Sequence, residues 1–173
     1  MKLFYLPGAC SLATHIALRE VGAAFELDRL DNASKQTESG ADFLAINPKG
    51  YVPALSLDSG EVLTEGVAIL QYIADQNPGK NLPPAAGSLA RTRLQEYLNF
   101  IATELHKSFS PLFTPGASEE AKTAAKKKVA QKLDLHRPRR LAASCRLPAA
   151  HRGARYGKVG PEGRRPGRLR QTT

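Results

Sequence analysis

The sequence predicts an α/β domain built on a mixed four-stranded sheet, in the order βαβ-ββα, followed by an incomplete all-α domain. The first observation is that short apolar runs alternate with helical patterns in the first part of the chain. A strand-helix-strand unit implies a right-handed parallel crossover, and a hairpin then adds two antiparallel strands. The second observation is that only helical patterns follow, and they stop at Leu135 before their apolar faces have partners.

The first three elements each have a local signal. Residues 2–5 are mainly apolar and predict a strand, after which a Pro-Gly turn leads into a helix. We expect Leu12 and Ile16 to lie on the inward face of that helix. Residues 25–30 alternate between apolar and polar side chains, which is typical of a strand.

The next elements complete the sheet. Residues 40–47 predict a short helix that ends at a Pro-Lys-Gly turn. Residues 51–57 and 61–63 predict a β-hairpin, because an Asp-Ser-Gly turn separates them. A further helix is expected over residues 65–74, and its apolar residues at helical spacing are Val67, Leu70, Ile73 and Ala74.

Pro/Gly-rich composition marks the boundary between the two parts. Ser88 can cap a helix that runs to about Leu112, and a second helix is expected to start at Ser118. The inward row of the long helix is Leu94, Leu98, Ile101 and Leu105. The predicted segments are a sheet-containing domain (1–80), a linker (81–87), a partial helical domain (88–135) and a basic tail (136–173).

The basic charge of the chain lies entirely in the tail. The chain has 173 residues and a formal charge of +9, but residues 1–135 carry −1 and residues 136–173 carry +10. The tail is rich in Arg, Pro and Gly and has no periodic apolar face, which predicts disorder. A natural basic arm, a terminus without consequence and a frameshift are the three explanations. We favour the frameshift, because Lys gives way to Arg in the middle of a helical pattern.

Several classes of protein do not fit the composition. No apolar run approaches the roughly 20 residues that span a bilayer, and the N-terminus lacks the pattern of a secretory signal. The two cysteines, Cys10 and Cys145, cannot form a disulfide-dense scaffold and have no zinc-ligand spacing. A reducing, cytoplasmic setting and the absence of a metal are therefore expected.

Cys10 is the first candidate for chemistry. It lies at the start of the first predicted helix, where amide N–H groups and the helix dipole lower the pKa of a thiol. This position favours a thiolate, although an inert buried cysteine is about equally frequent. Ser11 offers a hydroxyl in the same turn, or a helix cap.

Two further pairs could hold a ligand. Val52-Pro53 begins a strand, and the proline indicates a cis bond or a strand edge that leaves the Val52 backbone free for a peptide ligand. An ordinary strand-initiating proline is the alternative. Glu65-Gly66 opens a helix, where the Gly66 amide suits a carboxylate and Glu65 suits an ammonium group. Such a pair fits an α-amino acid, but acids are also common in first helical turns.

The long helix carries a polar row. Asn99, Thr103 and His106 occur at i, i+4 and i+7, so they share one face of a regular helix. A solvated face is the more frequent interpretation of such a row, and a face toward a polar site is the alternative.

Four segments, in this order and spacing, resemble bacterial beta-class glutathione S-transferases. They are YLPGACSLATHIALRE (5–20), NPKGYVPAL (47–55), LTEGVAILQYIA (63–74) and NFIATELHK (99–107). The resemblance covers residues 1 to about 135 and implies a thioredoxin-like N-terminal domain, an all-helical C-terminal domain and a homodimer.

The resemblance also implies roles for individual residues. Cys10 and His106 would be catalytic: Cys10 would lie beside the glutathione sulfur and could hold it as a mixed disulfide, and His106 would support it. The backbone of Val52 would pair with the cysteinyl part of glutathione, with Pro53 as a cis proline. The other implied glutathione-binding residues are Ser11, Lys35, Glu65, Gly66, Asn99, Thr103, Glu104 and Leu105, with Glu65 and Gly66 at the γ-glutamyl end.

The implied reaction joins glutathione, as co-substrate, to a small hydrophobic electrophile: RX + glutathione = HX + R-S-glutathione. Thiol-disulfide exchange through Cys10 is also open, and no prosthetic group is implied. The alternatives are a non-catalytic glutathione-binding module or an inactive truncated product. A nucleic-acid-binding protein ranks last, because neither aromatic interleaving nor a recognition fold is found.

Overall fold

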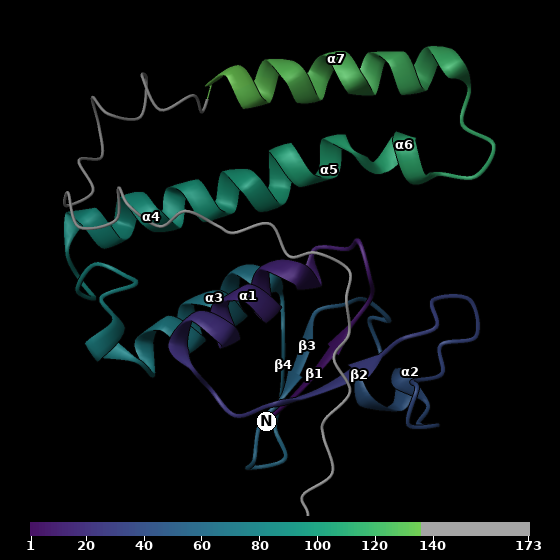
Figure 1. The fold of residues 1–173 in the computed structure, drawn as a ribbon. Coiled ribbons are helices and arrows are strands. Elements are labelled where there is room, and N and C mark those ends of the chain that lie inside the picture. Colours follow the sequence, from purple (N-terminus) through teal and green to yellow (C-terminus); the bar gives the residue numbers. More distant parts are fainter. Residues whose placement is uncertain (136–173) are drawn as a thin grey trace, which may run out of the picture.

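A computed structural model describes residues 1–135 of the chain. Its first part has the predicted order of strands and helices (Figure 1). In chain order the elements are β1 (Lys2–Tyr5), α1 (Ser11–Val21), β2 (Glu26–Arg29), α2 (Phe43–Ile46), β3 (Ala54–Ser56), β4 (Val62–Thr64), α3 (Gly66–Asp75) and η1 (Pro78–Lys80). The predicted tail, with Cys145, lies outside the described residues.

The strands form one mixed sheet of four strands in the order β2-β1-β3-β4. β1 runs parallel to β2 and antiparallel to β3, and β3 pairs antiparallel with β4. Leu3 in β1 lies opposite Leu27 on one side and Leu55 on the other. The predicted mixed four-stranded sheet is therefore confirmed, with the parallel pair joined through α1.

Helices cover both faces of the sheet, with α1 and α3 on one side and α2 on the other (Figure 1). Strand alternation explains this arrangement, because neighbouring residues of a strand point to opposite faces. Leu3 packs in the cluster under α1 and α3, whereas its neighbour Phe4 packs against Phe43 of α2. The core of the first cluster is Leu3, Leu18, Val21, Leu55, Ile69 and Ile73.

The buried face of α1 differs from the prediction. Leu12 and Ile16 are 56% and 45% exposed, and the helix instead buries a row that includes Thr14, Leu18 and Val21. The helix contacts α3 and the sheet through this row, so the apolar pair points away from them. The prediction followed the largest apolar residues, but a threonine occupies the inward position in the first turn.

The predicted inward face of α3 is partly right. Ile73 is buried as expected, and Ile69, one turn earlier, is buried completely. Val67 and Leu70 are only half-buried. Ile69 and Ile73 lie at i and i+4, so both reach the same side of the helix, which faces α1.

The second part is a helical hairpin in which the predicted single long helix is interrupted. Ser88 caps α4 as expected, since its hydroxyl accepts the Arg91 amide at 3.1 Å. The chain then passes through a π-helical segment before shorter α-helical turns and a return helix. These elements are α4 (Leu89–Phe100), η2 (Ile101–Leu105), α5 (His106–Ser108), α6 (Ser110–Phe113) and α7 (Glu119–Leu135).

The helical part buries few apolar side chains. α7 packs back against η2, α5 and α6 (Figure 1), and within residues 88–135 its Ala125 and Val129 are the only buried apolar residues. Of the predicted inward row, Ile101 is 44% exposed, while Leu94, Leu98 and Leu105 are half-buried. Among the described residues, apolar side chains such as Ile101, Phe113 and Leu133 stay exposed on these helices, in line with the predicted incomplete all-α domain.

One buried ion pair joins the two parts. Arg91 of α4 is 5% exposed, and its guanidinium donates to both carboxylate oxygens of Asp75 at the end of α3, at 2.8 and 2.6 Å. It also donates to the carbonyl of Pro84 in the connecting segment, at 3.3 Å. A second contact runs between the side chains of Gln95 and Gln71 at 3.0 Å. The start of α4 is therefore held against the end of α3.

Candidate functional site

Cys10 lies where β1 leads into α1, and its thiol reaches the beginning of the hairpin. The sulfur donates a hydrogen bond to the Val52 carbonyl at 3.3 Å. Residues far apart in the sequence thus meet at one point. The prediction left the Val52 backbone free, but in this structure its carbonyl accepts the Cys10 thiol. The sequence analysis expected either a cis bond or a strand edge at Pro53, and the Val52-Pro53 bond is cis.

The expected lowering of the Cys10 pKa is wrong. Cys10 is exposed at the surface, but neighbouring protein atoms remove part of the solvation of a thiolate, and this partial desolvation raises the pKa of the Cys10 thiol above its ordinary value. The backbone amides of Cys10 and Ser11 act in the opposite direction, as the helix-start argument predicted, but they are the smaller effect. The negative charge of Glu65 adds a further rise. The thiol form is thus favoured in the free protein.

The pH dependence of Cys10 alkylation tests this direction. In a Cys145→Ser background, we expect the rate of reaction with iodoacetamide to reach its midpoint above the usual thiol pKa of about 8.5. Glu65→Gln should move that midpoint down, because it removes a negative charge that disfavours the thiolate. Glu61→Gln, in an exposed acid of the β3-β4 turn, should leave it in place. A midpoint below 8.5 without the Glu65 substitution would contradict the assignment.

Ser11 serves the local fold. Its side chain is fully buried, accepts the Leu6 amide and donates to the Leu6 carbonyl, both at 3.2 Å. The hydroxyl is therefore used inside the loop that precedes α1. Only its backbone amide is directed toward the Cys10 sulfur.

The start of α3 adjoins Pro53. A Cβ placed on Gly66 would lie 3.5 Å from the Pro53 ring, which is ordinary van der Waals contact. Glu65 precedes the helix at φ +66°, a backbone region that non-glycine residues rarely adopt and that often marks a functional position. Its side chain is 72% exposed. Cys10, Val52-Pro53 and Glu65-Gly66 therefore form one continuous group, which we call the Cys10 site.

Lys35 lies beside the loop that leads to this site. Its ammonium donates to the Gly50 carbonyl at 3.2 Å and to the side chain of Asn32 at 2.8 Å. Lys35 itself has a positive φ of 58°. The predicted residue thus sits next to residues 47–51, on the approach to Val52.

The predicted residues on the helical part are not joined to the Cys10 site. Within residues 1–135 no hydrogen bond or ion pair links them to Cys10, Val52 or Glu65. The Glu104 carboxylate instead pairs with Lys132 of α7, which lowers the pKa of that carboxyl. The residues concerned are Asn99, Thr103, Glu104, Leu105 and His106.

The π-helical segment alters the predicted polar row. Its hydrogen bonds span five residues, as from the His106 amide to the Ile101 carbonyl, so the spacing of a regular α-helix does not apply. The Thr103 hydroxyl donates to the Asn99 carbonyl at 2.9 Å, and His106 is exposed. A π-segment frequently marks a functional region, and this one contains three of the predicted residues and ends beside His106.

Lys49 is a residue of the site that the sequence analysis missed. Its ammonium lies 3.0 Å from Glu65 Oε1 and 3.1 Å from the Thr64 hydroxyl. The sequence analysis used Lys49 only as part of a helix-ending turn. The sequence carries no local signal for this contact, because residues 49 and 65 are separated by a loop and by the whole β3-β4 hairpin.

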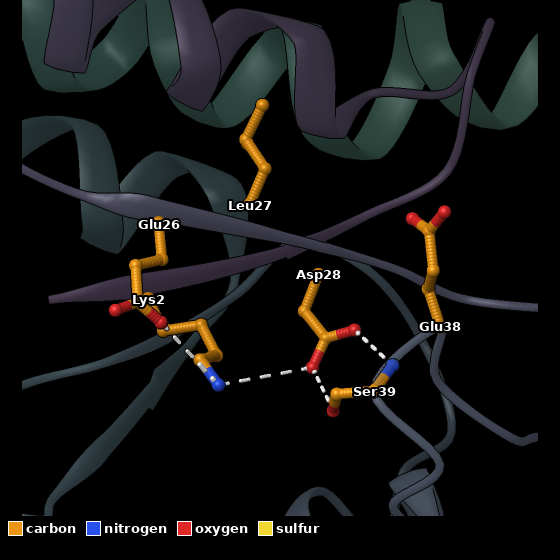
Figure 2. Close-up of a pocket in the computed structure, with 6 residues that line it drawn as sticks. All are labelled: Lys2, Glu26, Leu27, Asp28, Glu38 and Ser39. Carbon is orange, nitrogen blue, oxygen red and sulfur yellow. Dashed lines mark hydrogen bonds and ion pairs between the residues drawn. The ribbon is translucent and has the colours of Figure 1, made fainter.

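A second concavity lies at the opposite end of the strands, beside edge strand β2. It has a volume of about 270 Å³, and Figure 2 shows Lys2 and Ser39 converging on the Asp28 carboxylate inside it. Asp28 is 4% exposed and accepts from the Ser39 amide and hydroxyl at 3.1 and 2.6 Å. Its polar groups are thus satisfied internally.

In the part of the chain that the structure describes, no three His, Cys, Asp or Glu side chains are gathered to hold a metal ion. None of the helices between residues 1 and 135 combines the length and the apolar character needed to cross a bilayer.

Comparison with known proteins shows which protein family the sequence of this chain matches. Residues 1–75 match the family model described as glutathione S-transferase, N-terminal domain. Glutathione S-transferase GstA of Escherichia coli O157:H7 is 54% identical over 133 residues, which cover 77% of this chain and 66% of that protein. The chain therefore spans just under two thirds of the length of this relative.

Solved structures agree in sequence and in shape. A sphingomonad glutathione S-transferase complexed with glutathione is 60% identical with a TM-score of 0.75, and the match covers 78% of this chain and 67% of that one. A bacterial beta-class glutathione S-transferase of Sphingomonas chungbukensis is 59% identical, with the same coverage and TM-score. The thioredoxin-like fold expected for the first domain is confirmed by these matches. This chain belongs to the glutathione S-transferase family and is similar to bacterial beta-class members of it.

Proposed function

We propose that this protein binds glutathione at the Cys10 site and conjugates its sulfur to small hydrophobic electrophiles. The observation that carries the proposal is the meeting of three groups suited to a peptide thiol. They are the Cys10 thiol, the Val52 backbone beside it and the Glu65-Gly66 pair at the start of α3. The sphingomonad relative, complexed with glutathione, supports the same ligand.

Each group suits one part of glutathione. The Val52 backbone can pair with the cysteinyl peptide, and the Gly66 amide at a helix start can bind the γ-glutamyl carboxylate. The Glu65 carboxylate can take the γ-glutamyl ammonium. Lys35, beside the Gly50 carbonyl, is a cation suited to a remaining carboxylate. The α4-η2 residues would line the remaining subsite, with His106 in a supporting role.

The chemistry depends on keeping glutathione as a thiolate. In the free protein the Cys10 thiol donates its hydrogen bond to the Val52 carbonyl. When glutathione binds, the thiol, which keeps its proton, can instead donate this bond to the glutathione sulfur. The Cys10 and Ser11 amides add to this stabilisation. The glutathione thiolate then forms the new S–C bond while the C–X bond breaks; X leaves as an anion, and the former thiol proton completes HX.

Thiol-disulfide exchange is a second reaction open to Cys10. Its thiolate can attack the glutathione sulfur of a mixed disulfide, which forms a Cys10–glutathione disulfide and releases the other sulfur as a thiol. The proton lost by Cys10 ends on the leaving thiol. The raised pKa of Cys10 means that this reaction should accelerate as the pH rises.

Glutathione binding and conjugation test the proposal separately. By isothermal titration calorimetry we expect Glu65→Gln to weaken glutathione binding at least about tenfold, since a charged hydrogen bond is lost. Glu61→Gln, away from the site, should bind as the parent does. Conjugation to 1-chloro-2,4-dinitrobenzene, followed by absorbance, should be largely lost in a Cys10→Ala, His106→Ala double variant. A parent chain that binds no glutathione would overturn the proposal.

A non-catalytic glutathione-binding module is the second candidate. Two observations favour it. Within residues 1–135 no hydrogen bond or ion pair links the predicted α4-η2 residues to Cys10, Val52 or Glu65, and the helical part buries few apolar residues. Glutathione binding without conjugation would identify it.

We also propose that the protein forms a homodimer and lies in the cytoplasm. Sedimentation of the purified chain tests the dimer, and localisation of the tagged chain tests the cytoplasmic location.

A further inference from the structure

The Cys10 site contains a positive charge that the proposed glutathione contacts do not use. Lys49 Nζ lies 3.0 Å from Oε1 of Glu65, which precedes α3, and 3.1 Å from Oγ1 of Thr64, the last residue of β4. Glu65 Oε2 has no ion pair or hydrogen bond within residues 1–135. The carboxylate thus has one oxygen held by the protein and one oxygen available to a ligand.

The loop that carries Lys49 is well anchored. Asn47, which is 3% exposed, accepts the Lys49 amide through its side-chain oxygen at 3.2 Å and donates to the Tyr51 carbonyl at 2.8 Å. The Gly50 amide returns to the Asn47 carbonyl at 2.9 Å, and Gly50 has a φ of +68°. The backbone of Lys49 is therefore fixed, while its ammonium stays 56% exposed at the rim of the site.

The ion pair adds little to folding. Both side chains are more than half exposed, and ion pairs between exposed side chains contribute little to stability. Its arrangement is better explained by the ligand. An α-amino acid end carries an ammonium beside a carboxylate, and Glu65 and the Gly66 amide already offer one partner to each. Lys49 pairs with Glu65 at 3.0 Å, and Gly66 is the next residue of the chain, so a ligand carboxylate on the Gly66 amide would adjoin this ion pair.

We propose that Lys49 is a specificity-determining residue that orients the Glu65 carboxylate and shares the ligand's α-carboxylate with the Gly66 amide. Lys49, Glu65, the ligand ammonium and the ligand carboxylate then alternate in sign around a ring, so every neighbouring pair attracts. The inference rests on the proposed glutathione function. It means that Lys49 makes the site prefer a γ-glutamyl end that carries both an ammonium and a carboxylate over an end that carries only one of these charges.

Binding of glutathione and of one truncated analogue to charge variants tests the inference. For Lys49→Gln we expect the Kd of glutathione to rise about three- to tenfold, the range for one exposed, charge-assisted contact. The Kd of γ-aminobutyryl-cysteinylglycine, which lacks the α-carboxylate, should change less than twofold. Lys49→Arg keeps the charge and should recover most of the affinity. At 1 M NaCl, where the Debye length falls to about 3 Å, the difference between parent and Lys49→Gln should shrink.

Lys80→Gln is the matched control. It removes the same charge from an exposed lysine near the other end of α3, and glutathione should bind it as it binds the parent. Equal Kd values for Lys49→Gln and Lys80→Gln would overturn the inference while leaving the proposed function intact. Tighter binding by Lys49→Gln would also overturn it, because Lys49 would then compete with the ligand ammonium. No binding by the parent would instead remove the proposed function itself.

Discussion

Phe43→Ala is expected to destabilise the protein by about 3–5 kcal/mol, the range for removal of a buried aromatic ring. Phe43 is fully buried, and its ring centroid lies 5.6 Å from that of Phe4 on the α2 face of the sheet. This cluster has four buried apolar residues with three half-buried ones packed against them, so few side chains can move to fill the cavity. Total stabilities of small domains are about 5–15 kcal/mol, so the loss would be a large fraction.

Leu44→Ala is the matched control for that experiment. Leu44 is the next residue of the same short helix, but it is 44% exposed. Urea denaturation followed by circular dichroism should give it a loss of no more than about 1 kcal/mol. Equal losses for the two variants would contradict the assignment of the α2 face as core.

Asp75→Asn is expected to destabilise the protein by about 2–3 kcal/mol near neutral pH. The substitution removes the charge that pairs with Arg91, whose guanidinium is almost fully buried. Breaking a buried pair by removing one partner costs about 3–5 kcal/mol, and the partial exposure of Asp75 reduces that figure. Glu20→Gln, in an exposed acid of α1, should change stability by less than about 0.5 kcal/mol.

The Asp75 effect has a defined pH dependence. The hydrogen bonds from Arg91 hold the pKa of the Asp75 carboxyl below its ordinary value. A group with a lowered pKa in the folded state stabilises the fold above its unfolded pKa of about 3.9 and loses that contribution as the pH falls through the folded value. Parent and Asp75→Asn should therefore differ in urea midpoint at pH 7 and converge in acid. A difference that persists unchanged at pH 2 would contradict the ion-pair explanation.

Local patterns in the sequence were sufficient for most of the fold. Strand alternation and turn residues placed β1, the hairpin and the capped start of α4, because these signals depend on near neighbours. The four motifs likewise indicated Cys10, Val52 and Glu65 as parts of one site, and the structure brings these three together.

Helix faces and helix continuity were less predictable. Leu12 and Ile16 suggested an inward face for α1, but the packing of α1 on α3 selects the row with Thr14 and Leu18. The long helix was expected to be regular, yet a π-segment interrupts it after Phe100. The periodicity of a helix limits which residues can share a face, but the neighbouring elements decide which face is buried.

The sequence by itself determined the order of strands and helices, the family and the residue types at the site. Tertiary structure decided the electrostatics. Partial desolvation outweighs the helix-start amides and raises the pKa of the exposed Cys10 thiol. The loop before β3 brings the Lys49 ammonium to 3.0 Å from the Glu65 carboxylate. Solvation and charge-charge energies depend on distances between groups that the fold brings together, so spacing along the chain cannot supply them.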